Sequence, residues 1–413
     1  MSESLEGFLR IERGRVLASM IRFTGDIGLA EDAVHDAVVV ALEQWPRTGM
    51  PRNPGAWLTI TARNKALDRI RRESKRRTNE QIAQTLSEID APLPTGAVRD
   101  DQLRLLFTCC HPALSPEARV ALALRTICGL STAEIARVHL LPEPRIGQRI
   151  SRAKAKIAAA RIPYVIPEDH ELPDRLPSVL ITLYSVFTTG HHAAFGSLDS
   201  RVDLAHEGVR LIRTLVELMP DEPECTGLLA LVLATHARSS ARVDPSGDLV
   251  LMEDQDRSRW NHSDIAEAAA LVERVLARRR TGPYQIQAAI ACLHGLAVTW
   301  AETDWAQIAV LYALLEDVSP TPVVRVNRAV AVAHHEGPEA GLRLLETVDA
   351  ASVKSWHLYW STKAELLKRS GQRREAVDAY RRALACELND SDRRFLESQV
   401  IALERTQTGS LPS

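Results

Sequence analysis

The sequence predicts an all-α protein, and three observations support this class. Ala and Leu are abundant, whereas aromatic residues make up only 5% of the 413 residues. Apolar residues recur at spacings of three and four, and no segment shows the sustained alternation of a strand. No apolar run approaches the roughly 18 residues of a membrane span, and the N-terminus lacks the apolar core of a signal peptide. We therefore expect a helical, cytoplasmic protein of two or three domains.

The formal net charge of −2 hides an asymmetry along the chain. Residues 1–78 carry 14 basic and 10 acidic residues, and residues 101–161 carry 10 and 4. Residues 79–100 have a net charge of −3, which leaves −9 for residues 162–413. The basic first part of the chain, residues 1–161, suggests a polyanionic partner. The acidic rear half, residues 162–413, could attract this basic part.

The six cysteines do not form the disulfide framework of a small secreted protein. Cys109-Cys110-His111 resembles a fragment of a metal site but lacks the C-x-x-C spacing of zinc ligands. We expect buried, small apolar cysteines, with redox sensing or metal binding as the alternatives. No metal site and no cofactor are predicted.

The first elements in the chain are two helices, at about residues 5–24 and 29–45. Val34, Val38, Ala41 and Leu42 form the predicted core stripe of the second helix. Its exposed side is acidic, with Glu31, Asp32, Asp36 and Glu43. An acidic face does not favour nucleic acid, so Asp32 and Asp36 predict a protein partner, although acids also favour a helix N-terminus.

Residues 45–54 contain three prolines and a glycine and predict a loop. The helix that follows, at about residues 55–77, combines an aromatic residue with many polar and basic ones. This combination suits single-stranded nucleic acid, because bases stack on rings while cations hold phosphates. A solvated helix face explains the same charges. The candidate residues of this helix are Trp57, Arg63, Asn64, Arg69, Arg71 and Arg72.

Residues 79–100 are polar and predict a linker, and residues 101–161 predict a domain of about four helices. The third of these helices begins at a capping box formed by Ser131 and Glu134. The fourth has Pro144 in its first turn. Two short helices joined by a tight turn, the second amphipathic and cationic, are typical of a helix-turn-helix.

The second of these helices is the candidate reading helix for duplex DNA. Ile146, Ile150, Ala153 and Ile157 form its predicted buried stripe. A solvated basic helix packed on a core is the alternative. The residues predicted on its other face are Arg145, Gln148, Arg149, Arg152, Lys154 and Lys156.

Three stretches in this order resemble the bacterial extracytoplasmic-function (ECF) sigma factors. AEDAVHDAVVVAL is similar to their region 2.2, PGAWLTITARNKALDRIRR to regions 2.3 and 2.4, and LSTAEIARVHLLPEPRIGQRISRAKAKI to region 4.2. The resemblance implies that Asp32 and Asp36 dock on RNA polymerase core. It implies that the loop with Arg47, Arg52 and Asn53 captures a flipped base of the −10 element, and that the basic helix reads the −35 major groove.

The rear of the chain, after a proline-rich joint at residues 162–176, reads as successive helices. Trp360, Ala364, Leu367, Gly371, Ala376, Tyr380 and Ala383 follow tetratricopeptide spacings. Residues 177–413 therefore predict a TPR-like helical solenoid. LRLLFTCCHPAL, ARIPYVIP, EDQDRSRW and VNRAVAV resemble the ECF subgroup with such a C-terminal extension, which implies a regulatory role for it. The predicted helices are 177–190, 201–219, 223–240, 261–279, 283–302, 304–317, 322–336, 338–347, 355–370 and 372–386.

The charged segment Asp254-Gln255-Asp256-Arg257-Ser258-Arg259 is a candidate site in the rear half. Two carboxylates at this spacing could ligate a metal, but no third ligand or phosphate loop accompanies them. We expect Asp254, Asp256, Arg257 and Arg259 to form a structural or interdomain ion-pair network. A ligand site is the alternative.

These features predict a promoter-specificity subunit that has no enzymatic activity. Its partners would be RNA polymerase core, duplex DNA at −35, a melted strand at −10, and a protein or peptide on the solenoid. The alternative is a one-component helix-turn-helix regulator whose solenoid senses a ligand or peptide. The predicted strand-melting helix at about residues 55–77 argues against that alternative, because a one-component regulator does not need to melt DNA.

Overall fold

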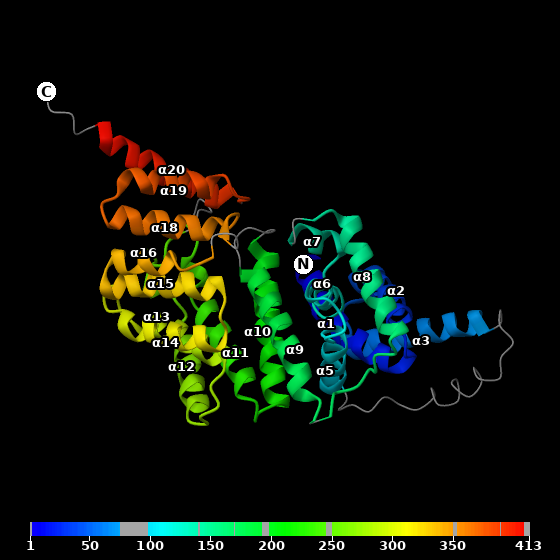
Figure 1. The fold of residues 1–413 in the computed structure, drawn as a ribbon. Coiled ribbons are helices and arrows are strands. Elements are labelled where there is room, and N and C mark those ends of the chain that lie inside the picture. Colours follow the sequence, from blue (N-terminus) through cyan, green and yellow to red (C-terminus); the bar gives the residue numbers. More distant parts are fainter. Residues whose placement is uncertain are drawn as a thin grey trace. The chain divides into compact units, whose positions relative to one another are not determined.

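The fold is known from a computed structural model, which describes residues 2–74, 98–138, 141–168, 170–191, 198–244, 250–349, 353–388 and 390–408. The elements of these residues are helices (Figure 1), as the sequence predicts. The chain forms two compact units. The N-terminal unit comprises residues 1–190 and 195–214, and the C-terminal unit comprises residues 191–194 and 215–413. The predicted linker at 79–100 lies almost entirely outside the described residues.

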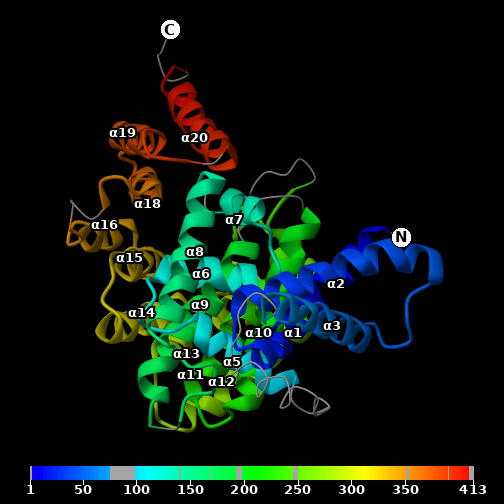
Figure 2. The same cartoon turned by 90° about the vertical axis from the view of Figure 1, so that its right-hand side faces the viewer.

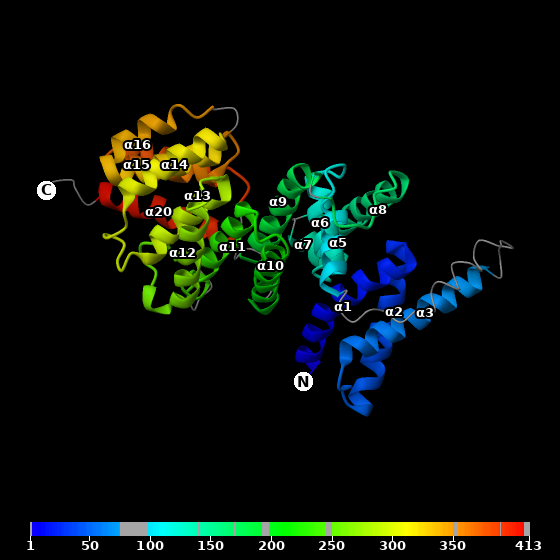
Figure 3. The same ribbon diagram turned by 90° about the horizontal axis from the view of Figure 1, so that it is seen from below.

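The N-terminal unit begins with three mutually packed helices, α1 (Ser2–Thr24), α2 (Ile27–Thr48) and α3 (Pro54–Ser74) (Figure 3). Asp26 caps α2, because its carboxylate accepts a hydrogen bond from Leu29 N at 2.7 Å. Two predictions are wrong here. The helix continues through Pro46 to Thr48, where a loop is predicted, and Leu42 is 42% exposed rather than part of the core.

Four further helices follow in this unit: α5 (Val98–Cys109), α6 (Pro116–Thr126), α7 (Thr132–Val138) and α8 (Glu143–Ala159). Helix α5 packs against α1, and α8 packs against both α6 and α7. The predicted buried stripe of α8 is confirmed, since Ile146, Ile150, Ala153 and Ile157 are all buried. Cys109, Cys110 and Cys128 are also buried, and burial raises the pKa of the Cys110 thiol to about 12.

Two helices of the rear half belong largely to the N-terminal unit. These are α9 (Leu172–His191) and most of α10 (Leu198–Leu218), so the compact units divide later than the predicted boundary at residue 177. Helix α9 contacts the backbone of α5 through Arg175 Nη2, which donates to Phe107 O at 2.9 Å, and Ser178 Oγ, which donates to Cys110 O at 2.5 Å. A Cβ on Gly208 would lie 3.0 Å from Phe187, so α10 lies directly against α9.

The C-terminal unit is a succession of helix pairs, as predicted for a solenoid, and Figure 2 shows the pairs nearest the C-terminus one after the other. Neighbouring pairs contact each other, with α11 against α13 and α14 against α15. The pairs are α11 (Pro223–His236) with α12 (His262–Leu276), α13 (Pro283–Leu296) with α14 (Trp305–Val318), α15 (Pro322–Glu336) with α16 (Pro338–Leu345), and α18 (His357–Arg369) with α19 (Arg373–Leu384).

The tetratricopeptide pattern corresponds to the α18–α19 pair. Ala364, Ala376 and Ala383 are fully buried between the helices, and Tyr380 is 1% exposed. Gly371 forms the turn with φ +79°, a conformation that favours glycine. The last helix, α20 (Asp390–Thr408), is absent from the prediction; it covers the pair with Leu396 and Leu403.

None of the helices in the described residues is long and apolar enough to span a membrane. Within the same residues, no group of three or more His, Cys, Asp or Glu side chains is arranged to hold a metal ion.

Candidate nucleic-acid interface

The helix-turn-helix is built by local hydrogen bonds that the sequence predicts. Glu134 N donates to Ser131 Oγ at 3.1 Å, and Ser131 N donates to Glu134 Oε2 at 2.7 Å. These two bonds are the predicted capping box, and they fix the start of α7. Pro144 stands in the first turn of α8, where its missing N–H costs nothing. The start and register of α8 are thus set locally.

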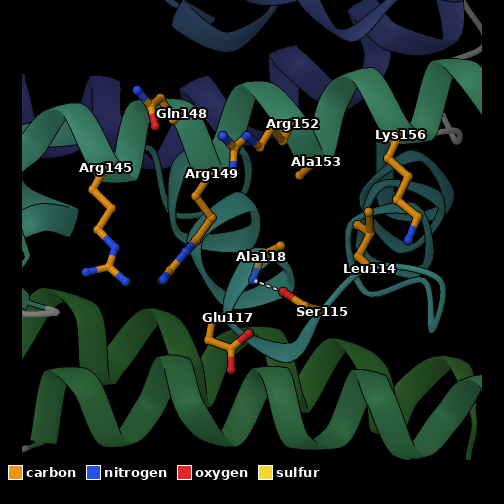
Figure 4. A pocket seen from close by; sticks show the side chains of 10 residues that line it. All are labelled: Leu114, Ser115, Glu117, Ala118, Arg145, Gln148, Arg149, Arg152, Ala153 and Lys156. Atoms are coloured by element: carbon orange, nitrogen blue, oxygen red, sulfur yellow. Dashed lines mark hydrogen bonds between the residues drawn. The ribbon is translucent and has the colours of Figure 1, made fainter.

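Five of the six predicted reading residues lie on one face of α8. Their spacing of three, four, seven and eleven residues from the first places them within one stripe of the helix. They line a groove of about 470 Å³ that faces the start of α6. In Figure 4, Arg145 and Arg149 extend from α8 toward Glu117, and Lys156 extends toward Leu114. We call this set the reading stripe: Arg145, Gln148, Arg149, Arg152 and Lys156.

The opposite wall of the groove is the N-terminus of α6. Ser115 Oγ accepts a hydrogen bond from Ala118 N at 3.3 Å and caps this helix. Hydrogen bonds from its own backbone N–H and from Ser115 lower the pKa of Glu117, with a smaller contribution from Arg149. The groove therefore contains four cations and a single carboxylate, which suits a polyanion such as a DNA backbone.

Lys154 does not belong to the reading stripe. It stands nine residues after Arg145, half a helical turn away from it, and its side chain points to the other side of α8. There Lys154 Nζ pairs with Glu31 Oε2 of α2 at 2.5 Å, and the two side chains are 25% and 12% exposed. The structure thus separates Lys154 from the other five predicted residues.

Gly147 also lies away from the reading stripe. The nearest atom to a Cβ built at this position would be Thr132 Cγ2 of α7, at 3.9 Å. Position 147 therefore faces the first helix of the helix-turn-helix, and the glycine does not remove a side chain from the stripe.

The predicted strand-melting residues separate into two groups. Trp57, Asn64 and Arg71 recur at intervals of seven, so they share a face of α3 with Ile60, which is 61% exposed. Trp57 is braced edge-on by buried Trp45, with ring centroids 5.4 Å apart. Arg47 in the last turn of α2, Arg52 in the loop and Arg72 of α3 are exposed. Asn53 caps α3 by accepting from Ala56 N at 3.1 Å.

Arg63 and Arg69 point to the flanks of α3 and pack within the unit. The guanidinium of Arg63 lies 5.2 Å from the ring centre of Phe23. Arg69 donates to Asp32 and, at 3.0 Å, to Asp36 Oδ2, so it joins α3 to the predicted core-binding acids. Burial opposes the charge of Arg69, but the hydrogen bonds and charges of the two aspartates raise its pKa.

The acidic face of α2 also carries apolar surface. Val39 stands seven residues after Asp32 and three after Asp36, on the same side of the helix, and is 39% exposed.

The candidate residues at 254–259 form contacts inside the C-terminal unit. Arg257 Nη1 donates to His294 O at 2.9 Å and to Ala297 O at 2.5 Å, where α13 ends. Arg259 Nη2 donates to Ser240 O, and Asp256 Oδ1 accepts from Ser258 N at 3.0 Å. Among the described residues, these arginines bind backbone carbonyls rather than the carboxylates that the prediction names, and Asp254 is exposed.

Three family models match successive parts of the chain. Residues 9–76 match Sigma-70 region 2, and residues 104–157 match Sigma-70 region 4. Residues 175–276 match a family of unknown function, DUF6596. The first two matches cover α1–α3 and α5–α8, which are the helices that carry the candidate interface.

Relatives agree with these matches. An uncharacterized protein of Rhizobium meliloti is 42% identical over 394 residues, which cover 94% of this chain and 93% of the relative. A probable ECF RNA polymerase sigma factor, SigI of Mycobacterium tuberculosis, is 30% identical over 40% of this chain and 59% of its own length. A probable RNA polymerase sigma-C factor of Mycobacterium bovis is 26% identical over 38% of this chain and 82% of its own length. No solved structure matches.

A capped helix-turn-helix with a cationic stripe, following a helical domain whose α3 face carries a half-buried tryptophan among polar residues, is the architecture of a DNA-binding protein. With both Sigma-70 regions in order, the chain belongs to the ECF sigma factor family, as a member with a long helical C-terminal extension. Its role is in transcription initiation.

Proposed function

We propose that this chain binds RNA polymerase core and directs it to promoters whose −35 element is read by α8. The observation that supports the proposal most strongly is the reading stripe, because the register of α8 presents five polar or basic side chains on one face. The N-terminal part of such a helix contacts base edges in the major groove, which places Arg145, Gln148 and Arg149 nearest the bases. Arg152 and Lys156 then contact phosphates of the DNA backbone.

The other two surfaces of the N-terminal unit complete this function. The exposed face of α3, with Trp57, Asn64 and Arg71, suits the melted −10 strand, and Arg47, Arg52 and Asn53 border it. Asp32, Asp36 and Val39 on α2 suit a basic and apolar surface of the polymerase core. The C-terminal unit modulates this activity. Its solenoid does so by binding a protein or peptide.

The decisive experiment adds the full chain to bacterial RNA polymerase core and a library of templates with randomised upstream sequence. Each template carries a barcode in its transcribed part, so sequencing the transcripts identifies the active templates, whose upstream sequences should share a −35 and −10 pair. Failure to obtain any transcript, together with tight binding of the free chain to a specific duplex, would favour the one-component regulator instead.

Arg145→Ala tests the reading stripe on the selected promoter. Loss of one good base contact costs about 1–3 kcal/mol of discrimination, so specificity should relax at one −35 position. Ser151→Ala is the matched control, because Ser151 is exposed on α8 but lies outside the stripe. Equal −35 preference of Arg145→Ala and the wild type would contradict this assignment.

A further inference from the structure

Helix α14 of the C-terminal unit (yellow in Figure 1) has an apolar face turned to solvent. Only three of its 14 residues are polar. Within the helix, Val310, Leu314 and Val318 are 60%, 49% and 52% exposed, although a surface helix normally turns polar residues to solvent. With exposed Ala306 they recur at every fourth residue and span about 120° of the helix circumference. We call these four residues the α14 stripe.

Exposed apolar side chains are concentrated around this helix. Of the sixteen large apolar side chains that are exposed in the described part of the chain, six lie between Leu296 and Val323. Helix α19, which like α14 is the second helix of its pair, has only charged residues at its exposed positions. The apolar face is therefore a property of α14 and not of the repeated helix pair.

The α14 stripe fits a second copy of itself in size. Two α14 helices that run antiparallel about a two-fold axis at Tyr312 bring each residue beside the one equally far beyond Tyr312 in the second copy. Val310 then lies beside Leu314 of the second copy, and Ala306 lies beside Val318. Each height of the helix pair holds one larger and one smaller side chain, so the two stripes can interdigitate.

The polar residues of the same face agree with this register. Gln307 and Asp317 are exposed, and neither side chain has a hydrogen-bond partner among the described residues. Both lie five residues from Tyr312, so the antiparallel register brings the Gln307 amide beside Asp317 of the second copy, where its N–H can donate to the carboxylate. A parallel pair would instead place the two Asp317 carboxylates together, where like charges repel.

The apolar surface extends beyond both ends of α14. Exposed Leu296 and Val298 precede the helix in the chain, and exposed Val323 follows it. Antiparallel packing places the start of one helix beside the end of the other. The segment that precedes α14 therefore meets the end at which Val318 and Val323 of the second copy stand.

We propose that two copies of this chain associate through α14, as a two-fold antiparallel helix pair centred on Tyr312. The inference does not depend on the proposed function, because it uses the C-terminal unit alone. Interfaces below about 1,200 Å² are typical of transient complexes, and one helix face of about 21 Å on each copy belongs to this class. The dimer should therefore be reversible and form at micromolar concentrations.

Sedimentation velocity of the full-length chain over a concentration series tests the surface. Leu314→Glu should raise the dimer Kd by about tenfold or more, because it puts two carboxylates into the apolar centre of the pair. Leu358→Glu is the matched control, since Leu358 of α18 is 51% exposed and lies outside the surface; its Kd should equal that of the wild type. A wild-type chain that stays monomeric at every concentration, or a dimer that Leu314→Glu leaves intact, would overturn the proposal.

Substitutions at Gln307 test the register with opposite signs. Gln307→Lys should lower the dimer Kd, because it places an ammonium beside Asp317 of the second copy, and Gln307→Glu should raise it. Both effects should shrink as salt rises. Equal dimer Kd values of the two variants would contradict this register.

Cross-linking tests the direction of the two helices. Ala306→Cys and Val318→Cys are made separately in a Cys386→Ser background, because the five other cysteines are buried. A short bismaleimide should join the two variants when they are mixed. It should not join either variant to itself, since equivalent positions of the two copies lie about 18 Å apart along the pair. Cross-linking of either variant alone as efficiently as of the mixture would overturn the antiparallel pair.

Discussion

Helical register decides what each cation of α8 can do. Lys154 and Lys156 are chemically identical and only two residues apart, yet one pairs with Glu31 and the other lines the groove. Successive residues on a helix are about 100° apart, so a separation of two places their side chains on nearly opposite faces. Arg69 shows the same effect on α3, where register directs it to Asp32 and Asp36 instead of the face that holds Trp57.

Gly147 provides a prediction about stability at the residue scale. An alanine there would meet only Thr132 Cγ2 at 3.9 Å, an ordinary contact, and alanine is favoured over glycine in a helix by about 1 kcal/mol. Gly147→Ala should therefore raise the free energy of unfolding by up to this amount and leave −35 affinity unchanged. Urea denaturation and duplex binding measure both quantities.

Gly14→Ala is the contrasting variant for that experiment. Its Cβ would lie 2.4 Å from a backbone oxygen that cannot easily move, so it should destabilise the N-terminal unit. Loss of stability in Gly147→Ala would mean that the backbone at 147 needs glycine for a reason that packing does not show.

Elements with strong local signals are the ones that the sequence predicts well. The α7 cap and the buried stripe of α8 follow from Ser131, Glu134 and the spacing of the isoleucines, because these interactions are local. The burial of Leu42 is predicted wrongly, and helix α20 is not predicted at all. Leu42 fits the apolar spacing of the core stripe, but its side chain faces outward. Helix α20 is rich in charged residues and buries few side chains, and the burial of those few depends on its contacts with α19.

In the candidate interface, too, the features set by local spacing are predicted and the contacts between distant helices are not. Spacing alone places the reading stripe on one face, but the partners of Lys154 and Arg69 are more than 30 residues away in sequence. Ion pairs between distant helices depend on tertiary packing, which no local pattern encodes.

The contact among α13, α14 and α15 gives the C-terminal unit a pH dependence. His294 and His334 lie against Trp305, with ring centroids 5.2 Å and 4.1 Å apart. Burial, with the nearby Arg238 and Arg257, lowers the pKa of His294 from 6.5 to about 4, and burial with Arg369 lowers that of His334 to about 4. Both rings are therefore neutral in the folded unit and protonate more readily when unfolded. Stability should be full above pH 6.5 and should decrease as pH falls from 6.5 toward 4.

Urea unfolding of the C-terminal unit at pH 7 and pH 5 measures this effect. His334→Phe retains a ring against Trp305 but cannot protonate, so it should reduce the loss between the two values. His335→Gln is the control, because His335 is exposed on the same helix. A loss of stability that His334→Phe does not reduce would place the titrating groups elsewhere.

At the scale of the whole molecule, the extension is not simply appended after the sigma-like domains. Arg175 and Ser178 bind the backbone of α5, so α9 completes the N-terminal unit. This also redistributes the charge. Residues 1–220 have a net charge of +3 and residues 221–413 have −5, so part of the acidic rear lies within the DNA-binding unit.

Truncation after residue 220 therefore tests whether the acidic C-terminal unit opposes DNA binding. If the solenoid competes with DNA for the reading stripe, residues 1–220 should bind the −35 duplex more tightly than the full chain at low salt. The difference should shrink as salt rises, because screening shortens the range of charge interactions. Equal affinities of the two proteins would exclude inhibition by charge. A truncation after residue 165 is the wrong comparison, since it removes α9 and leaves the α5 backbone at Phe107 and Cys110 without its partners. That shorter protein should melt at a lower temperature than residues 1–220, and a fall in its DNA affinity would reflect unfolding rather than the loss of the solenoid.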